Sequence, residues 1–223
     1  MPFELLIISA LSLSFTLDAH SILIRTQNTE DQQGELLALA NLVQYISRMI
    51  IVLSIFLISI ATETKHIKIN YEMIFAGSSL ISLLLIILLI KSEFFSNAIC
   101  TAVRPAIILF FRSMAHKTFW KKIKLTNVAR LTYSSFGMNS LAIAAAFIPF
   151  LIADYMPQYR MTSVYAGQML NFGATALVLT IQDPNAMRLL DSGNADAARS
   201  SILIGRILSH AFAVLIFGII ILS

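Results

Sequence analysis

Several charged and amide side chains lie inside strongly hydrophobic stretches of this chain, where they could together bind a polar substrate. The set comprises Asp18 in the first stretch, Asn41, Gln44 and Arg48 in the second, Gln168 and Asn171 in a later one, and Arg206 in the last. Residues three, four or seven positions apart share one face of a helix. Because charge at membrane depth usually faces a protein interior or a wet cavity, the pattern predicts one hydrated cavity lined by these side chains.

The charges of this predicted cavity are mostly positive. Arg48 and Arg206 outnumber Asp18, and the planar guanidinium group suits phosphate and diphosphate and stays charged in a partly dry site. The cavity is therefore predicted to favour anions. His20 and His210 are candidates for proton linkage, because imidazole changes charge near neutral pH.

Each of these side chains also has a structural interpretation. Amides and hydroxyls often bond across neighbouring membrane helices, a membrane histidine can simply be packed and hydrogen-bonded, and Asp18 can form a permanent ion pair with an arginine. Substrate binding and internal contacts are thus both open for the polar residues.

The elements that would position these residues are transmembrane helices. Hydrophobic residues make up 57% and charged residues 13% of the 223 positions, whereas a soluble domain carries about 25% charged residues. A bilayer core of about 30 Å needs roughly 20 apolar helical residues. Six stretches meet this requirement, at residues 3–24, 36–61, 73–90, 134–153, 163–181 and 200–222. The sequence therefore predicts an all-α fold, a polytopic transmembrane helix bundle in a single domain.

The segment 94–124 predicts a further helix, basic and amphipathic, that lies in the plane of the membrane. On a helix Asn97, Arg104 and Arg112 fall on one side, and basic residues on the polar face are typical of interfacial helices. A seventh, pore-lining span over residues 94–111 is the alternative. The lysines at the end of the segment form a strip that would attract anionic phospholipid: Lys117, Lys121, Lys122 and Lys124. Nucleic acid is a poor alternative partner, because the flanking sequence is membrane-buried.

The charge bias of the connecting regions predicts the orientation. In a six-span topology the regions 25–35, 91–133 and 183–199 hold eleven lysines and arginines, and the opposite loops hold three. Basic loops stay in the cytoplasm, so both termini are predicted to lie outside. In a seven-span topology the cytoplasmic regions hold ten lysines and arginines and the opposite loops hold three. The charge bias therefore does not choose between the two topologies. Glu4 stands where a cleavable signal would carry a positive charge, so residues 3–24 are predicted to be a retained span.

Motifs for catalysis and metal binding are absent from the sequence. It contains no P-loop, no HExxH motif and no GxSxG motif. The single cysteine, Cys100, allows neither an intrachain disulfide nor a cysteine-rich metal site. We therefore expect no enzymatic activity, no cofactor and no metal.

Four short elements in order along the chain resemble a known family. They are Asn41-Leu-Val-Gln-Tyr-Ile-Ser-Arg48, Pro157-Gln-Tyr-Arg160-Met-Thr162, Asn171-Phe-Gly-Ala-Thr175 with the later Asp183-Pro184, and Gly205-Arg206. In order and spacing they resemble segments of the Amj family of lipid II flippases. The resemblance covers both ends of the chain, while residues 91–133 match only as a basic, amphipathic loop.

The resemblance implies a flippase that moves an undecaprenyl-diphosphate-linked sugar, the lipid II precursor of peptidoglycan, across the bacterial inner membrane. Arg48 and Arg206 would hold the diphosphate, Asp18 would orient an arginine, and Arg160 would lie at the outer mouth. The amides would bond sugar hydroxyls: Asn41, Gln44, Gln168 and Asn171. Since six spans make a tight cavity for this headgroup, a homodimer is a further expectation. Two alternatives stay open, a structural or regulatory subunit of a membrane complex and an exporter of small anionic solutes.

Overall fold

The chain folds into a bundle of long helices. The computed structural model describes residues 2–26, 33–63, 70–92 and 128–222, with isolated positions 95, 98, 99 and 101. These residues contain the helices α1 (Pro2–Arg25), α2 (Gln33–Glu63), α3 (Tyr71–Lys91), α5 (Ala129–Tyr155), α6 (Arg160–Leu177), α7 (Asp183–Asp191) and α8 (Ala195–Leu222), and no strand. Six helical segments among them are long and apolar enough to cross a membrane, with α6 and α7 counted as one. The predicted all-α transmembrane bundle is confirmed.

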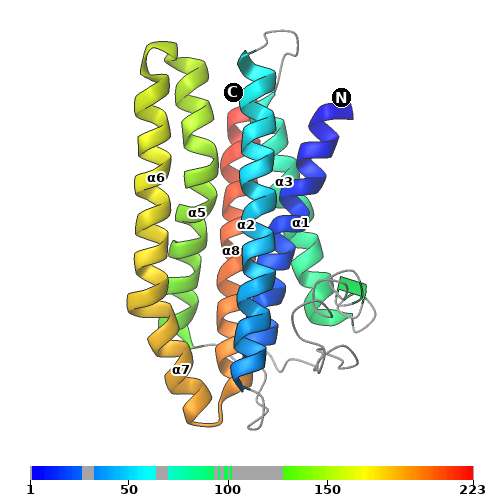
Figure 1. Cartoon of the computed structure of the whole chain (residues 1–223), viewed down its shortest axis with the longest axis vertical. Coiled ribbons are helices and arrows are strands. Elements are labelled where there is room, and N and C mark those ends of the chain that lie inside the picture. The colour runs from blue at the N-terminus through cyan, green and yellow to red at the C-terminus, as the bar shows by residue number, and fades with distance from the viewer. Residues whose placement is uncertain are drawn as a thin grey trace.

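Helix α1 runs through the middle of the bundle. It packs against α2 and α3 along much of its length and also meets α8, which in turn packs against α3 and α5. Helix α6 lies at the edge and packs against α5 (Figure 1). Of the six spans, α1 is the most buried, with apolar side chains such as Ile7, Leu11 and Ala19 in the interior.

Small hydroxyl residues hold α1 and α2 together. The Ser14 hydroxyl donates to the Ser47 carbonyl oxygen at 2.7 Å, and the Ser47 hydroxyl donates to the Ser14 carbonyl oxygen at 2.9 Å. Hydroxyl bonds of this kind contribute on the order of 1 kcal/mol between membrane helices. This reciprocal contact fixes the register of α2 on α1, and therefore the position of Arg48, the next residue.

A glycine allows α8 and α5 to approach each other closely. A Cβ atom at Gly205 would lie 2.6 Å from the Thr132 carbonyl oxygen and 2.7 Å from the Ser135 Cβ. The Ser135 hydroxyl donates to the Ile202 carbonyl oxygen at 2.9 Å across the same contact. Small residues permit such backbone approach in membranes, and this contact places Arg206 beside α5.

We expect Gly205→Ala to destabilise the protein by roughly 1–3 kcal/mol, because the added methyl group has no space and the two helices must separate. Gly218→Ala is the matched control, since it lies in the same helix and a Cβ there meets no atom within 4 Å. Thermal unfolding in detergent, followed by circular dichroism, measures both variants. Equal melting temperatures for the two variants would contradict the close approach.

The two ends of the bundle differ in charge. The end formed by the last turn of α1 and the first turn of α8 carries five described basic residues, Arg25, Lys91, Arg130, Arg188 and Arg199, together with three aspartates, Asp183, Asp191 and Asp196. We call this the basic end. The opposite, acidic end carries Glu4, Glu72 and Asp154. Helix α3 ends and α5 begins at the basic end (Figure 1), as the six-span topology requires. The predicted in-plane helix of residues 94–124 and the strip Lys117, Lys121, Lys122 and Lys124 lie largely or wholly outside the described residues.

The helical segment that begins with α6 continues beyond residue 181, the predicted end of the fifth span. A π-helical turn, η4 (Val178–Gln182), joins it to α7 without a break. Pro184, in the first turn of α7, lacks an amide proton. The Asn185 side-chain amide donates to the Ile181 carbonyl oxygen at 2.6 Å in the same region. Helix α7 ends at Asp191, and Gly193 follows with a φ of 75°, the left-handed conformation typical of a glycine after a helix.

The region 183–199, predicted as a cytoplasmic loop, is therefore mostly helical. Arg199, which belongs to α8, is buried, and its Nε donates to the Thr26 carbonyl oxygen at 2.9 Å. Its Nη1 lies 3.4 Å from the Asp196 carboxylate. Arg199 thus joins the first turn of α8 to the end of α1.

Candidate substrate cavity

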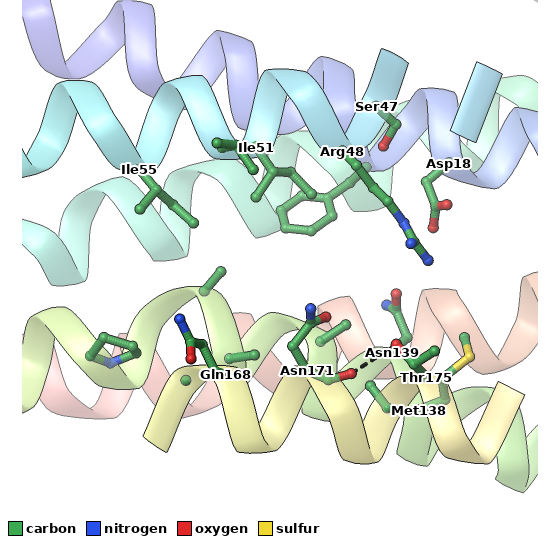
Figure 2. A pocket seen from close by; sticks show the side chains of 18 of the residues that line it. Asp18, Ser47, Arg48, Ile51, Ile55, Met138, Asn139, Gln168, Asn171 and Thr175 are labelled. Carbon is green, nitrogen blue, oxygen red and sulfur yellow. Dashed lines mark hydrogen bonds between the residues drawn. The ribbon is translucent and has the colours of Figure 1, made fainter. Parts of the chain in front are cut away.

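A cavity of about 720 Å³ lies between α2 on one side and α5 and α6 on the other. Helices α1 and α8 contribute residues to its floor, among them Asp18 and Arg206. Figure 2 shows Arg48, Ile51 and Ile55 of α2 facing Gln168, Asn171 and Thr175 of α6 across this space. Helix α2 packs mainly on α1, and α6 packs mainly on α5. The cavity therefore lies between two pairs of packed helices.

The structure brings most of the predicted site residues to this one cavity. Six of the eight predicted substrate-binding residues line it, namely Asp18, Gln44, Arg48, Gln168, Asn171 and Arg206. Asn41 is not among the lining residues, and the Arg160 side chain lies outside the described part of the chain. Separate helices therefore converge as the polar stripes predict.

Arg206 and Asp18 form an ion pair at the floor of the cavity. The Nη1 atom of Arg206 donates to Oδ2 of Asp18, and the two side chains are 5% and 22% exposed. The Arg206 Nε is buried and has no hydrogen-bond partner among the described residues. Asn139 of α5 donates to the Ser209 hydroxyl, which donates to the Arg206 carbonyl oxygen at 2.8 Å. Arg206 is therefore held in place by Asp18 on one side, while its buried Nε has no described partner.

Arg48 lines the same cavity but is not paired. Its side chain is exposed, and no hydrogen bond or ion pair joins it to another described residue. In Figure 2 its guanidinium group extends into the space between α2 and α6, on the side where Asp18 lies. A guanidinium carries five donors and always a positive charge. Among the described residues, Arg48 is thus a cation without a partner that lines a protein cavity.

A third arginine lines the cavity toward the basic end. Arg25 donates to Asn41 Oδ1 at 2.8 Å and to Gln44 Oε1 at 3.3 Å, and its Nη1 lies 3.7 Å from Asp183 Oδ1. The pair with Asp183 connects α1 to α7, and so joins the two sides of the cavity. The amides Asn41 and Gln44, predicted to bond sugars, here hold Arg25.

The predicted site did not include Arg25, Asn139 or Gln182. Arg25 shares a predicted polar face with Asp18, and Gln182 shares one with Gln168 and Asn171, but Arg25 was also counted with the connecting region 25–35. Gln182 belongs to η4 and is buried with its Oε1 lacking a described partner. Asn139 gave no signal, because it is the only amide of its span.

The two histidines do not reach the cavity. Both His20 and His210 are buried, and neither is among the residues that line it. The His210 ring packs edge-on against Phe15, with ring centroids 5.0 Å apart. A proton link through either residue therefore stays a prediction, and it would have to act through the packed interior.

The cavity is polar at one end and apolar at the other. Its part near the basic end is lined by charged and amide residues, which are Asp18, Arg25, Gln44, Arg48, Asn139, Gln182 and Arg206. Near the acidic end the lining is mainly apolar, with Tyr71, Phe150, Ala153 and Val164, and Ser59, Ser163 and Gln168 as polar exceptions. This gradient matches an amphiphile better than a uniformly polar solute.

Fold and site together define a multi-pass α-helical membrane protein with an arginine-containing cavity between its helices. Among the described residues no group of three or more histidine, cysteine, aspartate or glutamate side chains could hold a metal ion. No protein-family model, curated protein or solved structure matches the chain.

Proposed function

We propose that this protein is a flippase for an undecaprenyl-diphosphate-linked sugar, the lipid II precursor of peptidoglycan, in the bacterial inner membrane. The observation that carries the proposal is the unpaired Arg48 in a cavity with one polar and one apolar end. The resemblance of the Arg48, Asn171, Asp183 and Arg206 segments to the Amj family supports the same substrate.

The arginines suit a diphosphate. Arg48 presents its whole guanidinium fork, and Arg206 lies beside it in the lining of the same cavity. Charge-assisted bonds from arginine to phosphate are short and strong, and often bidentate. Asp18 pairs with Arg206, and in the proposal a phosphate oxygen adds to this pair or replaces the carboxylate during the cycle.

The size of the cavity limits how much of the headgroup it encloses. At roughly 30 Å³ for each water-sized group, 720 Å³ has room for a diphosphate and one sugar ring. A disaccharide that carries a peptide is larger than this. In the proposal its outer part stays in water at the basic end, while the amide of Asn171, which lies nearer that end than Gln168, contacts the first sugar.

The proposed orientation places the basic end in the cytoplasm. Lysine and arginine are retained on that side of the membrane, and the described basic residues gather there. The cavity is then polar on the side where lipid-linked precursors are made and apolar toward the opposite side.

Reconstitution into liposomes tests the proposed function. We expect the purified protein to move fluorescent lipid II from one leaflet to the other, measured by loss of protection from a quencher that does not cross the membrane. Expression should also restore growth to cells that lack their main lipid II flippase. A stable complex with another protein and no lipid movement would instead indicate a structural subunit. Transport of water-soluble anions without a lipid chain would indicate a solute exporter.

A further inference from the structure

The apolar half of the cavity has a defined shape of its own. Ile51 and Ile55 of α2 form one wall, and Ala142, Ala145 and Pro149 of α5 form the other with Gly167 of α6. We call these six residues the apolar slot. Figure 2 shows Ile51 and Ile55 facing the α5–α6 side across open space.

The α5–α6 wall of the slot is made almost of backbone. A Cβ atom at Gly167 would lie 2.5 Å from the Pro149 Cγ and 2.9 Å from the Ala145 carbonyl oxygen, so the two helices are in close contact there. Alanine, glycine and proline leave no long side chain to fill the space in front of them. The slot is therefore open because its wall is small, and larger side chains would close it.

The slot continues directly from Arg48. Arg48, Ile51 and Ile55 are spaced i, i+3 and i+7 on α2, so they share one face and all line the cavity. At 1.5 Å per residue, Ile55 lies about 10 Å beyond Arg48 toward the acidic end. A phosphate on Arg48 would thus place an attached chain along the slot.

The direction of this arrangement matches a lipid of the cytoplasmic leaflet. Such a lipid has its phosphate toward the cytoplasm and its chain toward the middle of the bilayer. With the basic end in the cytoplasm, the order from Arg48 to Ile55 follows the same direction. The opposite leaflet would require the reverse order.

We propose that the apolar slot binds the part of a single polyprenyl chain nearest its phosphate, in a lipid loaded from the cytoplasmic leaflet. The chemistry that it recognises is a phosphate ester of one apolar chain. This inference rests on the proposed function and deepens it, because the chain is then recognised by the protein and does not stay wholly in the bilayer.

The slot acts through shape. A chain that moves from lipid into the slot leaves one apolar environment for another, so little hydrophobic free energy is gained. What the slot provides is room for one chain beside Arg48. A larger residue in the slot should therefore exclude the chain without weakening the contact of the phosphate.

Binding titrations with two phosphate esters test this inference. The full chain is placed in phosphatidylcholine nanodiscs and titrated with undecaprenyl phosphate and with dimethylallyl phosphate, which has the same ester and a very short chain. We expect Ala145→Leu to weaken binding of undecaprenyl phosphate about tenfold, as steric overfilling predicts, and to leave dimethylallyl phosphate binding unchanged. Ala144→Leu, the same change at a position that does not line the cavity, should alter neither.

A second variant fills the slot from the opposite wall. Ile55→Phe should have the same selective effect, so the test does not depend on the folding of one variant. Unchanged binding of undecaprenyl phosphate in both variants would overturn the slot. Phosphatidic acid, which has two chains, is titrated in the same way. If the two variants weaken its binding as much as they weaken the binding of undecaprenyl phosphate, the assignment to a single chain is overturned.

The same variants separate this inference from the proposed function. If wild-type protein binds undecaprenyl phosphate through the slot but moves no lipid II in liposomes, the flippase proposal fails and the slot stands. If both slot variants move lipid II at the wild-type rate, the slot fails and the flippase proposal stands.

Discussion

Replacing Arg48 with alanine is expected to abolish lipid II movement while the protein stays folded. Arg48 has no partner among the described residues, so its loss breaks no described internal contact. Each hydrogen bond to a charged group contributes about 1.5–3 kcal/mol, and a bidentate phosphate contact makes two. We therefore expect a loss of substrate affinity of about a hundredfold or more, measured by titration with undecaprenyl diphosphate and by the liposome assay.

Two further variants show whether the effect belongs to the guanidinium fork. Arg48→Lys should retain intermediate activity, since it keeps the charge and loses the planar pair of donors. Arg188→Ala removes an exposed arginine of α7 that does not line the cavity, and it should transport normally. Wild-type transport by Arg48→Ala at a normal protein level would refute the assignment of this residue to the substrate.

Removing Arg206 should have the largest effect on stability. Breaking a buried ion pair by loss of one partner costs about 3–5 kcal/mol, and Asp18 would be left without its partner beside the cavity. Because the Asp18 side chain keeps 22% exposure, we expect Arg206→Ala to lower the free energy of unfolding by about 3 kcal/mol, the lower end of this range. Thermal unfolding in detergent measures this change.

A double variant separates folding from function at the same pair. Arg206→Gln with Asp18→Asn replaces the ion pair by two neutral amides that can bond each other, and removes both buried charges. This variant should recover much of the lost stability and still fail to move lipid II, because its second phosphate contact is missing. Full transport by the double variant would show that the pair is only structural.

The transmembrane helices could be predicted from the sequence because their signal is local. A run of about 20 apolar residues is sufficient to identify a span, and each of the six predicted runs lies mostly within a helix or a continuous helical segment of the structure. The limits were less accurate around Pro184, where the π-helical turn η4 continues the helix into α7. Proline occurs in the first turn of a helix as well as after a helix end, so the local pattern does not distinguish this continuation from a helix end.

The convergence of polar residues was predictable, but their pairing was not. Helical spacing placed Gln168 with Asn171 and Gln44 with Arg48 on common faces. Whether an arginine is free or paired depends on which helices become neighbours. The contact of α8 with α1 places Asp18 beside Arg206, so these two residues form the ion pair and Arg48 has no partner among the described residues. No spacing within one helix specifies this pairing.

The isolation of Arg48 also makes the cavity sensitive to membrane voltage. Of the three lining arginines, Arg25 and Arg206 are paired with aspartates, so the described lining of the empty site carries one uncompensated positive charge. In a transporter whose site is reached from each side in turn, a full charge that crosses 100 mV changes the free energy by about 2.3 kcal/mol. An interior-negative voltage then draws the empty site to the cytoplasmic side. A bound diphosphate reverses the sign of the site, and the same voltage favours its movement outward.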